Sequence, residues 1–428
     1  MKKKIGIIGL WHLGCVISAS WAKLGNEVIG FDYDESRIKN LQKGFPPVFE
    51  PNLAELIKNN IKNNLLKYSS DLIDLKDCDY IFLCYDTPVI DDDISDTYIL
   101  QRSVSDVKKI MKNGSILIVS SQSPVGYCSE LRKNLKDYNN TLDIAYSPEN
   151  LRLGEAIECY LHPDRIILGV PNNEIKQKCS ELFNQVTDNI LTMNLESAEM
   201  VKHGINSFLS MSIVFANHIA DICEEKGAII DDVIRGIKSD VRIGQKAYLS
   251  PGIGFSGGTL GRDLKVLDSV NVSSNGFAKL FGIIHKLNSE RKFAILKKTE
   301  NILNGIEGKR LGILGLTYKP GTSTLRRSLP LEIVHLFLSK KAKIKVYDPK
   351  ADYSELNYEP NFEISKNIEE VAKNMDILIL LTEWEEFKIF DWLSVIDSMN
   401  NKIFYDTKNF LDGSKMKNYG FKYFSTGR

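Results

Sequence analysis

The start of the chain and the stretch from about residue 309 share one pattern. In both, an apolar run suited to a β-strand leads into a glycine turn and a helix-like stretch, and a second strand-like run ends in an acid. The paired segments are KKKIGIIGLWHLG and KRLGILGLTYKPG, then VIGFDY and IKVYDP, then CDYIFLCY and MDILILLT. A repeated strand–helix–strand unit constrains the fold strongly, because parallel strands need a crossover that is usually a helix. The sequence therefore predicts an α/β chain with two Rossmann-like, doubly wound domains.

The repeats are separated by a helical region. Over residues 1–190, helix-like stretches alternate with the strand-like runs KIGIIGL, EVIGFD, CDYIFLCY, GSILIVSS, LDIAYS and RIILGV, which predicts a parallel sheet. From Leu195, apolar residues recur at helical spacing as far as Gly227. We expect three domains, over residues 1–190, 191–300 and 301–428, with the long central helix joining the two Rossmann-like ones. The broad apolar surface of this helix also suggests pairing with a second subunit, as a homodimer.

Charge and cysteine content exclude several classes of protein. Lys and Arg total 55, as do Asp and Glu, so the formal net charge is zero. No nucleic-acid partner is expected, since that would need a basic surplus on some face. The seven cysteines are scattered without a C-x-x-C pair, which fits reduced thiols better than disulfides or a zinc site. The six histidines show no H-x-x-x-H spacing, so no metal centre is expected.

The N-terminus allows two interpretations. MKKK followed by IGIIGLWHLGCVISASWA has the basic residues, apolar run and small residues of a signal peptide. The alternative is a first strand that enters a glycine turn and a helix. The next segment, GNEVIGFDYD, has the pattern of a second strand ending in an acid, which favours the strand and a cytoplasmic protein. No other segment has the apolar length to span a membrane, so no membrane partner is expected.

The turn GLWHLG resembles the dinucleotide fingerprint G-x-G-x-x-G. Trp11 stands at the middle glycine, where bare backbone normally lets the pyrophosphate approach, so its ring must turn aside or stack on the cofactor. Asp32 ends the next strand and could accept hydrogen bonds from both ribose hydroxyls, which favours NAD over NADP. A Rossmann-like domain that has lost its cofactor is the alternative, and we favour NAD binding. The residues expected at the cofactor in this region are Gly9, Trp11, His12, Leu13, Gly14 and Asp32.

Two further segments carry polar residues at positions suited to ligand binding or catalysis. YSPENLRLGEAI places Glu149 and Arg152 at a strand end, where ligands bind in open α/β sheets. Ser147–Glu149 could also begin a helix, and the two interpretations are compatible. Lys202 and Asn206 lie four residues apart and so share one helix face. Apolar neighbours would partly desolvate such a lysine, and a desolvated amine can serve as a base, although a solvated lysine on an amphipathic helix is the commoner case.

A long glycine-rich segment, SDVRIGQKAYLSPGIGFSGGTLGRD, contains Arg242, Thr259 and Asp263. Its glycines expose backbone amides against which a ligand can lie closely. It is either a plain surface loop or a site, and loops of this length in compact domains are usually functional.

Taken together and in this order, the motifs resemble the UDP-glucose/GDP-mannose dehydrogenase family over essentially the whole chain. The matching segments are GLWHLG, SPENLR, K-x-x-x-N at 202–206, RIG at 242–244, PGIGFSGGTLGRD, and GLTYKPGTSTLRRS from 315. The resemblance implies an N-terminal NAD domain, a central helix that forms the dimer and a C-terminal domain that holds the nucleotide. It implies oxidation of the C6 hydroxyl of a nucleotide sugar to a carboxylate with two NAD, in surface polysaccharide biosynthesis.

The resemblance also implies roles for individual residues. Lys202 and Asn206 would contact the oxidised hydroxyl and stabilise its oxyanion, and Asp263 would orient a water or the lysine. Arg242 could reach into the partner subunit's site. Lys319 and Arg326 would approach the diphosphate, for which the arginine fork is well suited. The full set of implied substrate-binding residues is Glu149, Leu151, Arg152, Arg242, Gly254, Phe255, Gly257, Gly258, Lys319 and Arg326.

The sequence departs from the family pattern at several positions. Thr259 stands at the catalytic cysteine, and Leu153 stands at the second glutamate of the family's PEFLRE. Gln122, expected at the cofactor, replaces a threonine of STVP. Ser323 and Thr324 replace a pair of acids. Retained Lys202, Asn206 and Asp263 belong to the first half-reaction, from alcohol to aldehyde, whereas the lost cysteine and glutamate belong to the thioester half.

These losses predict altered chemistry, since a threonine hydroxyl is far less acidic than a thiol and needs a strong adjacent base. The favoured version stops after one two-electron oxidation. The alternatives are an epimerase that returns the hydride, full oxidation through an aldehyde hydrate, and an inactive protein that only binds nucleotide sugar.

Overall fold

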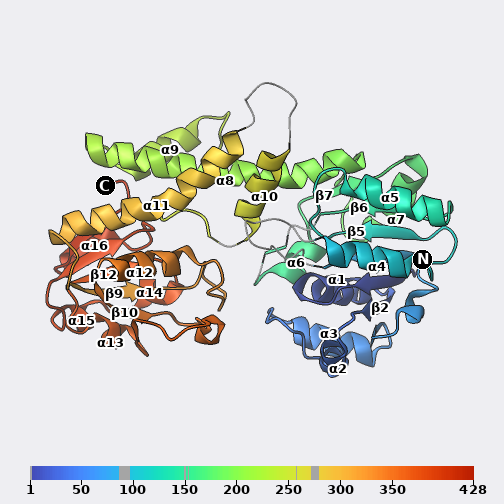
Figure 1. The fold of residues 1–428 in the computed structure, drawn as a ribbon, viewed down its shortest axis with the longest axis horizontal. Coiled ribbons are helices and arrows are strands. Elements are labelled where there is room, and N and C mark those ends of the chain that lie inside the picture. The colour runs from blue at the N-terminus through green and yellow to red at the C-terminus, as the bar shows by residue number, and fades with distance from the viewer. Residues whose placement is uncertain (1, 86–96, 149–150, 153, 257, 271–278) are drawn as a thin grey trace. The chain divides into compact units, whose positions relative to one another are not determined.

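The computed structural model describes residues 2–85, 97–148, 151–152, 154–256, 258–270 and 279–428 (Figure 1). The chain divides into two compact units, Met1–Gly204 and Ile205–Arg428. Each unit contains one sheet covered by helices, so the predicted class of two Rossmann-like domains is confirmed. In the described residues we find no helix with the length and apolar character needed to cross a bilayer.

The first unit holds an eight-stranded sheet in the order β3-β2-β1-β4-β5-β6-β7-β8. The winding reverses between β1 and β4, which creates the switch point where α/β sheets bind ligands. The strands are β1 (Lys4–Ile8), β2 (Glu27–Phe31), β3 (Leu66–Ser69), β4 (Tyr80–Leu83), β5 (Ile116–Val119), β6 (Asp143–Tyr146), β7 (Ile166–Gly169) and β8 (Ile190–Met193).

Two strands and one pairing differ from the prediction. The edge strands β3 and β8 were not predicted; their sequences, LKYS and ILTM, mix polar with apolar residues, and β8 is only partly buried. β8 also extends the sheet past residue 190. β6 and β7 pair antiparallel, whereas all other described pairs are parallel. The connection between these two strands contains the six-residue helix α6 (Ala156–Leu161).

Helices cover both faces of this sheet. Alternate residues of a strand point to opposite faces: Phe82 packs into one core cluster, and its neighbours Ile81 and Leu83 pack into the other. Burial on both faces explains why the strands are near-continuous apolar runs. The helices of this unit are α1 (His12–Lys23), α2 (Glu35–Gln42), α3 (Leu53–Lys62), η1 (Leu72–Leu75), α4 (Tyr98–Val107), α5 (Tyr127–Tyr138), α6 (Ala156–Leu161) and α7 (Asn173–Phe183).

The predicted long helix is confirmed as α8 (Leu195–Lys226), which runs from the first unit into the second. Gly227 follows it with φ +73°, a conformation that glycine adopts without strain and that ends helices. Three further helices precede the second sheet: α9 (Ile230–Ser239), α10 (Thr259–Ser269) and α11 (Leu280–Leu303). α10 packs against α11.

The second sheet has the order β11-β10-β9-β12-β13-β14, all parallel, with its switch point between β9 and β12. Its strands are β9 (Arg310–Leu314), β10 (Lys343–Tyr347), β11 (Glu363–Ile364), β12 (Ile377–Leu380), β13 (Ile403–Asp406) and β14 (Lys422–Ser425). Its helices are α12 (Leu329–Ser339), η3 (Tyr353–Glu355), α13 (Ile368–Ala372), α14 (Glu385–Ile389), α15 (Leu393–Ile396) and α16 (Gly413–Asn418).

The internal repeat extends to a hydrogen bond. In the first unit Asp32, after β2, accepts a hydrogen bond from the Leu10 amide at 2.7 Å. In the second unit Asp348, after β10, accepts one from the Leu316 amide, also at 2.7 Å. The acid-tipped strand therefore serves the same local purpose in both units, because its carboxylate satisfies the turn that follows the first strand.

Candidate functional site

The glycine turn between β1 and α1 has the tight geometry that the sequence predicts. Gly9 has φ +91°, in the left-handed region that favours glycine. A Cβ on Gly14 would lie 1.8 Å from the Gly9 carbonyl oxygen, so a side chain there would block the contact between α1 and the turn. His12 is the first residue of α1, and Leu13 is buried.

Trp11 and Asp32 are connected through Arg37, which the sequence argument did not include. The Arg37 guanidinium donates a hydrogen bond to Asp32 Oδ2 at 2.7 Å. Its Cζ also lies 5.2 Å from the centroid of the Trp11 ring, within the range of a cation–π contact. Asp32 is buried, and its Oδ1 accepts from the Asp34 amide at 3.0 Å. The Trp11 ring is thus turned to the side of Asp32 and Arg37.

Glu199, another residue that the sequence did not single out, holds the turn that contains Gln122. This buried carboxylate on α8 accepts hydrogen bonds from the amides of Gly126, at 2.6 Å, and Cys128, at 2.8 Å. Burial raises the pKa of Glu199. Gln122 is half-buried in the turn after β5. Nothing in the spacing of the sequence pointed to Glu199, because its partners lie some 70 residues away.

The segment after β6 is only partly described. Glu149 and Leu153 lie outside the described residues. Leu151 packs against the first core cluster, and Arg152 is exposed. The interpretation that a helix begins at Ser147–Glu149 is wrong, since Leu151 and Arg152 are not helical and α6 begins only at Ala156.

Three of the four predicted catalytic residues are brought together in the second unit. Asn206 on α8 donates a hydrogen bond from Nδ2 to Asp263 Oδ2 on α10, and both residues are buried. Thr259 is the first residue of α10, one turn before Asp263 and on the same helix face. Its side chain is exposed. The fourth, Lys202, is buried on α8 one turn before Asn206, so it is not a solvated surface lysine.

The glycine loop is fixed by side chains of α8 and α11. Asn288 accepts a hydrogen bond from the Phe255 amide at 2.8 Å and donates one to the Phe255 carbonyl at 2.9 Å. Asn217 accepts from the Gly252 amide at 2.7 Å. Gly254 has φ +107°, and a Cβ there would lie 2.6 Å from Asn288 Oδ1. Gly257 lies outside the described residues, and Gly258 directly precedes α10.

Removing the Asn288 side chain should destabilise the protein. Asn288→Ala leaves the Phe255 amide and carbonyl without their partner, and an unsatisfied buried polar group costs about 1–3 kcal/mol. The free energy of unfolding is measured by urea denaturation. Ser289→Ala, at an exposed position of the same helix, is the control. Equal stability of the two variants would contradict the role of Asn288.

The remaining predicted substrate residues lie on exposed or half-buried segments. Arg242 is exposed and paired with Asp240, with Nη2 and Oδ2 2.7 Å apart. Lys319 is half-buried beside the Tyr318 ring, at 5.7 Å from its centroid. Arg326 is exposed, and its amide donates to Glu355 at 3.1 Å. Glu355 thus brings a carboxylate to the turn that contains Thr324, whose hydroxyl donates to it at 2.7 Å.

The cysteines offer no thiol near Thr259 in the sequence. All seven precede residue 224, and in the described residues none of them forms a disulfide. Cys223, the last of them, is buried in a separate cluster with Ala220 and Ile230. Burial raises the pKa of the Cys78 and Cys179 thiols to about 12, which keeps them protonated and inert. Across the described residues, His, Cys, Asp and Glu side chains form no cluster of three suited to a metal ion.

Comparison with protein families gives three adjoining matches to the UDP-glucose/GDP-mannose dehydrogenase family. Its NAD-binding domain matches residues 3–187, its central domain residues 196–290, and its UDP-binding domain residues 312–413. The UDP-glucose 6-dehydrogenase of Rickettsia felis is 31% identical, over 99% of this chain and 96% of that protein. The UDP-glucose 6-dehydrogenase of Rhizobium meliloti is 30% identical over 99% of each chain.

Solved structures share the fold over the whole chain. The UDP-glucose dehydrogenase of Pyrobaculum islandicum superimposes with a TM-score of 0.89 at 23% identity, over 100% of this chain and 98% of that one. The UDP-D-ManNAc dehydrogenase of Pyrococcus horikoshii gives 0.86 at 24% identity over 99% of each. At these identities the likeness concerns the fold alone.

Proposed function

The chain belongs to the UDP-glucose/GDP-mannose dehydrogenase family, and we propose that it oxidises a hydroxyl of a nucleotide-activated hexose and stops after one two-electron step. It is an NAD-dependent oxidoreductase that acts on CH–OH groups, with a nucleotide sugar as substrate class. The observation that carries the proposal is the exposed Thr259 at the start of α10, one turn from Asp263.

The N-terminal turn fits NAD. Gly9 and Gly14 leave bare backbone where α1 begins, and the Trp11 ring lies on the side of Arg37. We assign the pyrophosphate to this turn and to the N-terminus of α1, and the adenosine ribose to Asp32 and Arg37. We also assign Gln122 to this site. Bound NAD supplies the oxidant, since it takes two electrons as a substrate C–H bond breaks.

The chain's own residues bind and polarise the substrate hydroxyl. Lys202 would donate a hydrogen bond to this oxygen and stabilise the negative charge that grows as the proton leaves. Asn206 is fixed by Asp263, so that its amide has a defined orientation. Asp263 would hold the water that takes the proton. The loop 254–258 and the residues Glu149, Leu151, Arg152, Arg242, Lys319 and Arg326 would bind the nucleotide sugar.

At positions 259 and 153 the chain lacks the thiol and the carboxylate that the second oxidation would use. A thioester route needs a thiolate, and Thr259 offers a hydroxyl that only a strong base could activate. Leu153 offers no carboxylate to activate water. A free aldehyde or ketone is therefore the proposed product.

We further propose that the chain forms a homodimer. Exposed apolar residues recur on α8 at helical spacing, at Phe208, Met211, Phe215 and Ile222, which favours a homodimer through this helix. We also propose the domain division 1–190, 191–300 and 301–428, supported by the extents of the three family matches. A cytoplasmic place in surface polysaccharide biosynthesis would fit a nucleotide-sugar substrate.

A panel of nucleotide sugars tests the proposal. The purified protein is incubated with NAD and each sugar, with absorbance recorded for NADH and mass spectrometry for the product. We expect NADH with at least one UDP- or GDP-hexose. Absence of NADH with every sugar would contradict it, and a changed sugar without net NADH would indicate an epimerase. Light scattering of the same preparation checks the dimer.

Cofactor choice should depend on the pair formed by Asp32 and Arg37. Asp32→Ala removes the acceptor for the ribose hydroxyls and leaves the Arg37 guanidinium free to bind a 2′-phosphate. Because a hydrogen bond to a charged group contributes about 1.5–3 kcal/mol, we expect NADH to bind at least about tenfold more weakly and NADPH to gain affinity. Calorimetry with both cofactors measures this. Equal affinities of the unaltered protein for NADH and NADPH would contradict the role of Asp32.

A further inference from the structure

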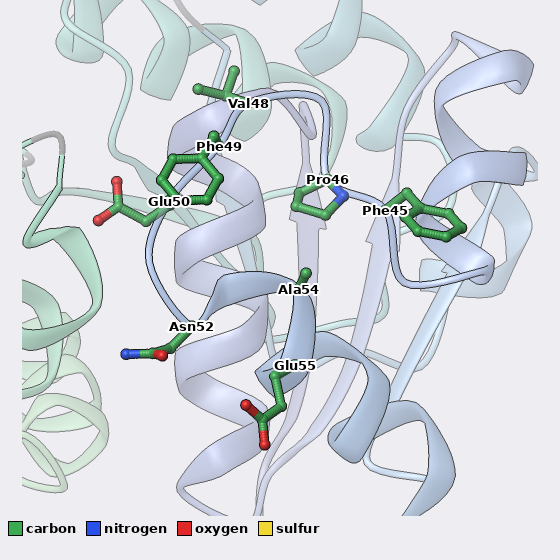
Figure 2. Close-up of a pocket in the computed structure, with 8 residues that line it drawn as sticks. All are labelled: Phe45, Pro46, Val48, Phe49, Glu50, Asn52, Ala54 and Glu55. Carbon is green, nitrogen blue, oxygen red and sulfur yellow. The ribbon is translucent and has the colours of Figure 1, made fainter. Parts of the chain in front are cut away.

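Glu50 is a buried acid in a loop that exposes its aromatic residues. The loop between α2 and α3 leaves Phe49 with 87% of its surface exposed, whereas Glu50 is only 4% exposed. Phe45, Phe49, Glu50 and Glu55 are among the residues that line a hollow of about 420 Å³ here (Figure 2). Burying a charge is costly unless it is fully hydrogen-bonded, so the position of Glu50 must be explained by its contacts.

Those contacts join two segments that lie far apart in the sequence. Glu50 Oε2 accepts hydrogen bonds from His12 Nε2 at 2.8 Å and from the Gly154 amide at 3.0 Å. Glu50 Oε1 accepts from the Ala156 amide at 2.9 Å. His12 is the first residue of α1, directly after the cofactor turn. Gly154 and Ala156 follow the segment proposed to bind the sugar; Ala156 is the first residue of α6, and Gly154 lies two residues before it.

The two helices are also packed against each other. α1 and α6 share the first core cluster, and the Trp21 and Tyr160 rings meet edge to face with centroids 6.3 Å apart. This packing fixes the helices along their lengths. Glu50 fixes their N-terminal ends, where a cofactor turn and a substrate segment would have to be held in register.

We propose that Glu50 is a positioning residue, which sets the start of α1 relative to the start of α6 and thereby aligns bound NAD with the sugar. This inference rests on the proposed function for the sugar segment, and on NAD binding for the cofactor turn. A displacement of about 1 Å can cost on the order of 100-fold in rate even when each ligand still binds. Loss of Glu50 should therefore lower kcat more than it weakens either ligand alone.

The test compares Glu50→Gln with Glu55→Gln, an exposed acid of the same hollow (Figure 2). Glutamine keeps the size but has one acceptor oxygen in place of two, so at least one of the three donors loses its partner. We expect kcat at saturating NAD and sugar to fall about 10- to 100-fold. The Kd of NADH alone should change less than about threefold, a change of under about 0.7 kcal/mol. Glu55→Gln should match the unaltered protein.

His12→Phe provides a second variant, since it removes the ring's hydrogen bond but leaves both backbone contacts of Glu50. It should lower kcat in the same direction. An unchanged kcat in Glu50→Gln would overturn the inference. So would a parallel loss of NADH affinity and melting temperature, which indicates a structural role only.

Amide hydrogen exchange, measured with NADH but without sugar, tests the role of Glu50 independently of the proposed function. In the unaltered protein, NADH should slow amide hydrogen exchange in residues 154–161, and Glu50→Gln should abolish that protection while Glu55→Gln keeps it. Equal protection in all three proteins, or none in any, would overturn the inference even if no sugar substrate were found. Failure of every sugar to yield NADH, with protection as expected, would instead overturn the proposed function alone.

Discussion

Lys202→Ala is expected to lose most of its turnover while it remains folded. A positioned group that acts on the reacting proton contributes about 10²- to 10⁴-fold to the rate. Lys202 is buried one turn before Asn206 on α8, where a methyl group can neither polarise the substrate oxygen nor stabilise its charge. Initial rates of NADH formation at saturating sugar and NAD measure the loss.

Lys226→Ala on the same helix is the matched control, because this lysine is exposed in the last turn of α8. Its turnover should equal that of the unaltered protein. NADH affinity should be similar in both variants, since the cofactor turn is untouched. If Lys202→Ala turned over like the control, Lys202 would have no part in the reaction.

Thr259→Cys alone is expected to leave the product unchanged, although it introduces a thiol at the start of α10. A thiol of ordinary pKa, near 8.5, can become a thiolate in a suitable site and trap the aldehyde. The resulting thioester would still need activated water, and Leu153 supplies no carboxylate. Thr259→Cys with Leu153→Glu should therefore be the first variant to yield appreciable sugar acid. Product masses of the single and double variants measure this difference.

The physical advantage of the double variant is the covalent tether. A covalent adduct keeps the second C–H bond at the cofactor, and such tethering reaches effective molarities of up to ~10⁵–10⁸ M in well-oriented cases. Thr259→Ser, which retains a hydroxyl, is the control and should behave like threonine. Efficient acid formation by Thr259→Cys alone would show that position 153 is not limiting.

The parts of the fold that were predictable are those with strong local patterns. The extent of α8 could be predicted from the helical spacing of its apolar residues and from Gly227, which follows its last residue. The first strand, turn and helix could be predicted from one short motif. β3 and β8 were missed because each is a four-residue edge strand with polar residues among its apolar ones. The antiparallel pairing of β6 with β7 depends on the path of the connection between them, which no local signal reports.

Some residues of the candidate site could likewise be predicted from the sequence, and others could not. Asp32 and Lys202 stand in motifs, so the sequence identifies them. Arg37, Glu50 and Asn288 do not, because each matters only through partners that the fold brings close. Asn288, for example, holds a loop 33 residues away. A buried acid such as Glu50 looks like any surface acid until its three donors are visible.

The central claim is tested most directly by the number of NADH molecules formed per sugar consumed. The unaltered protein is run to completion with limiting nucleotide sugar and excess NAD, with NADH measured by absorbance and the product by mass spectrometry. The proposed single oxidation predicts one NADH per sugar and a product two mass units lighter than the substrate, as loss of two hydrogens requires. Two NADH per sugar and a sugar acid would show that Thr259 does not limit the chemistry.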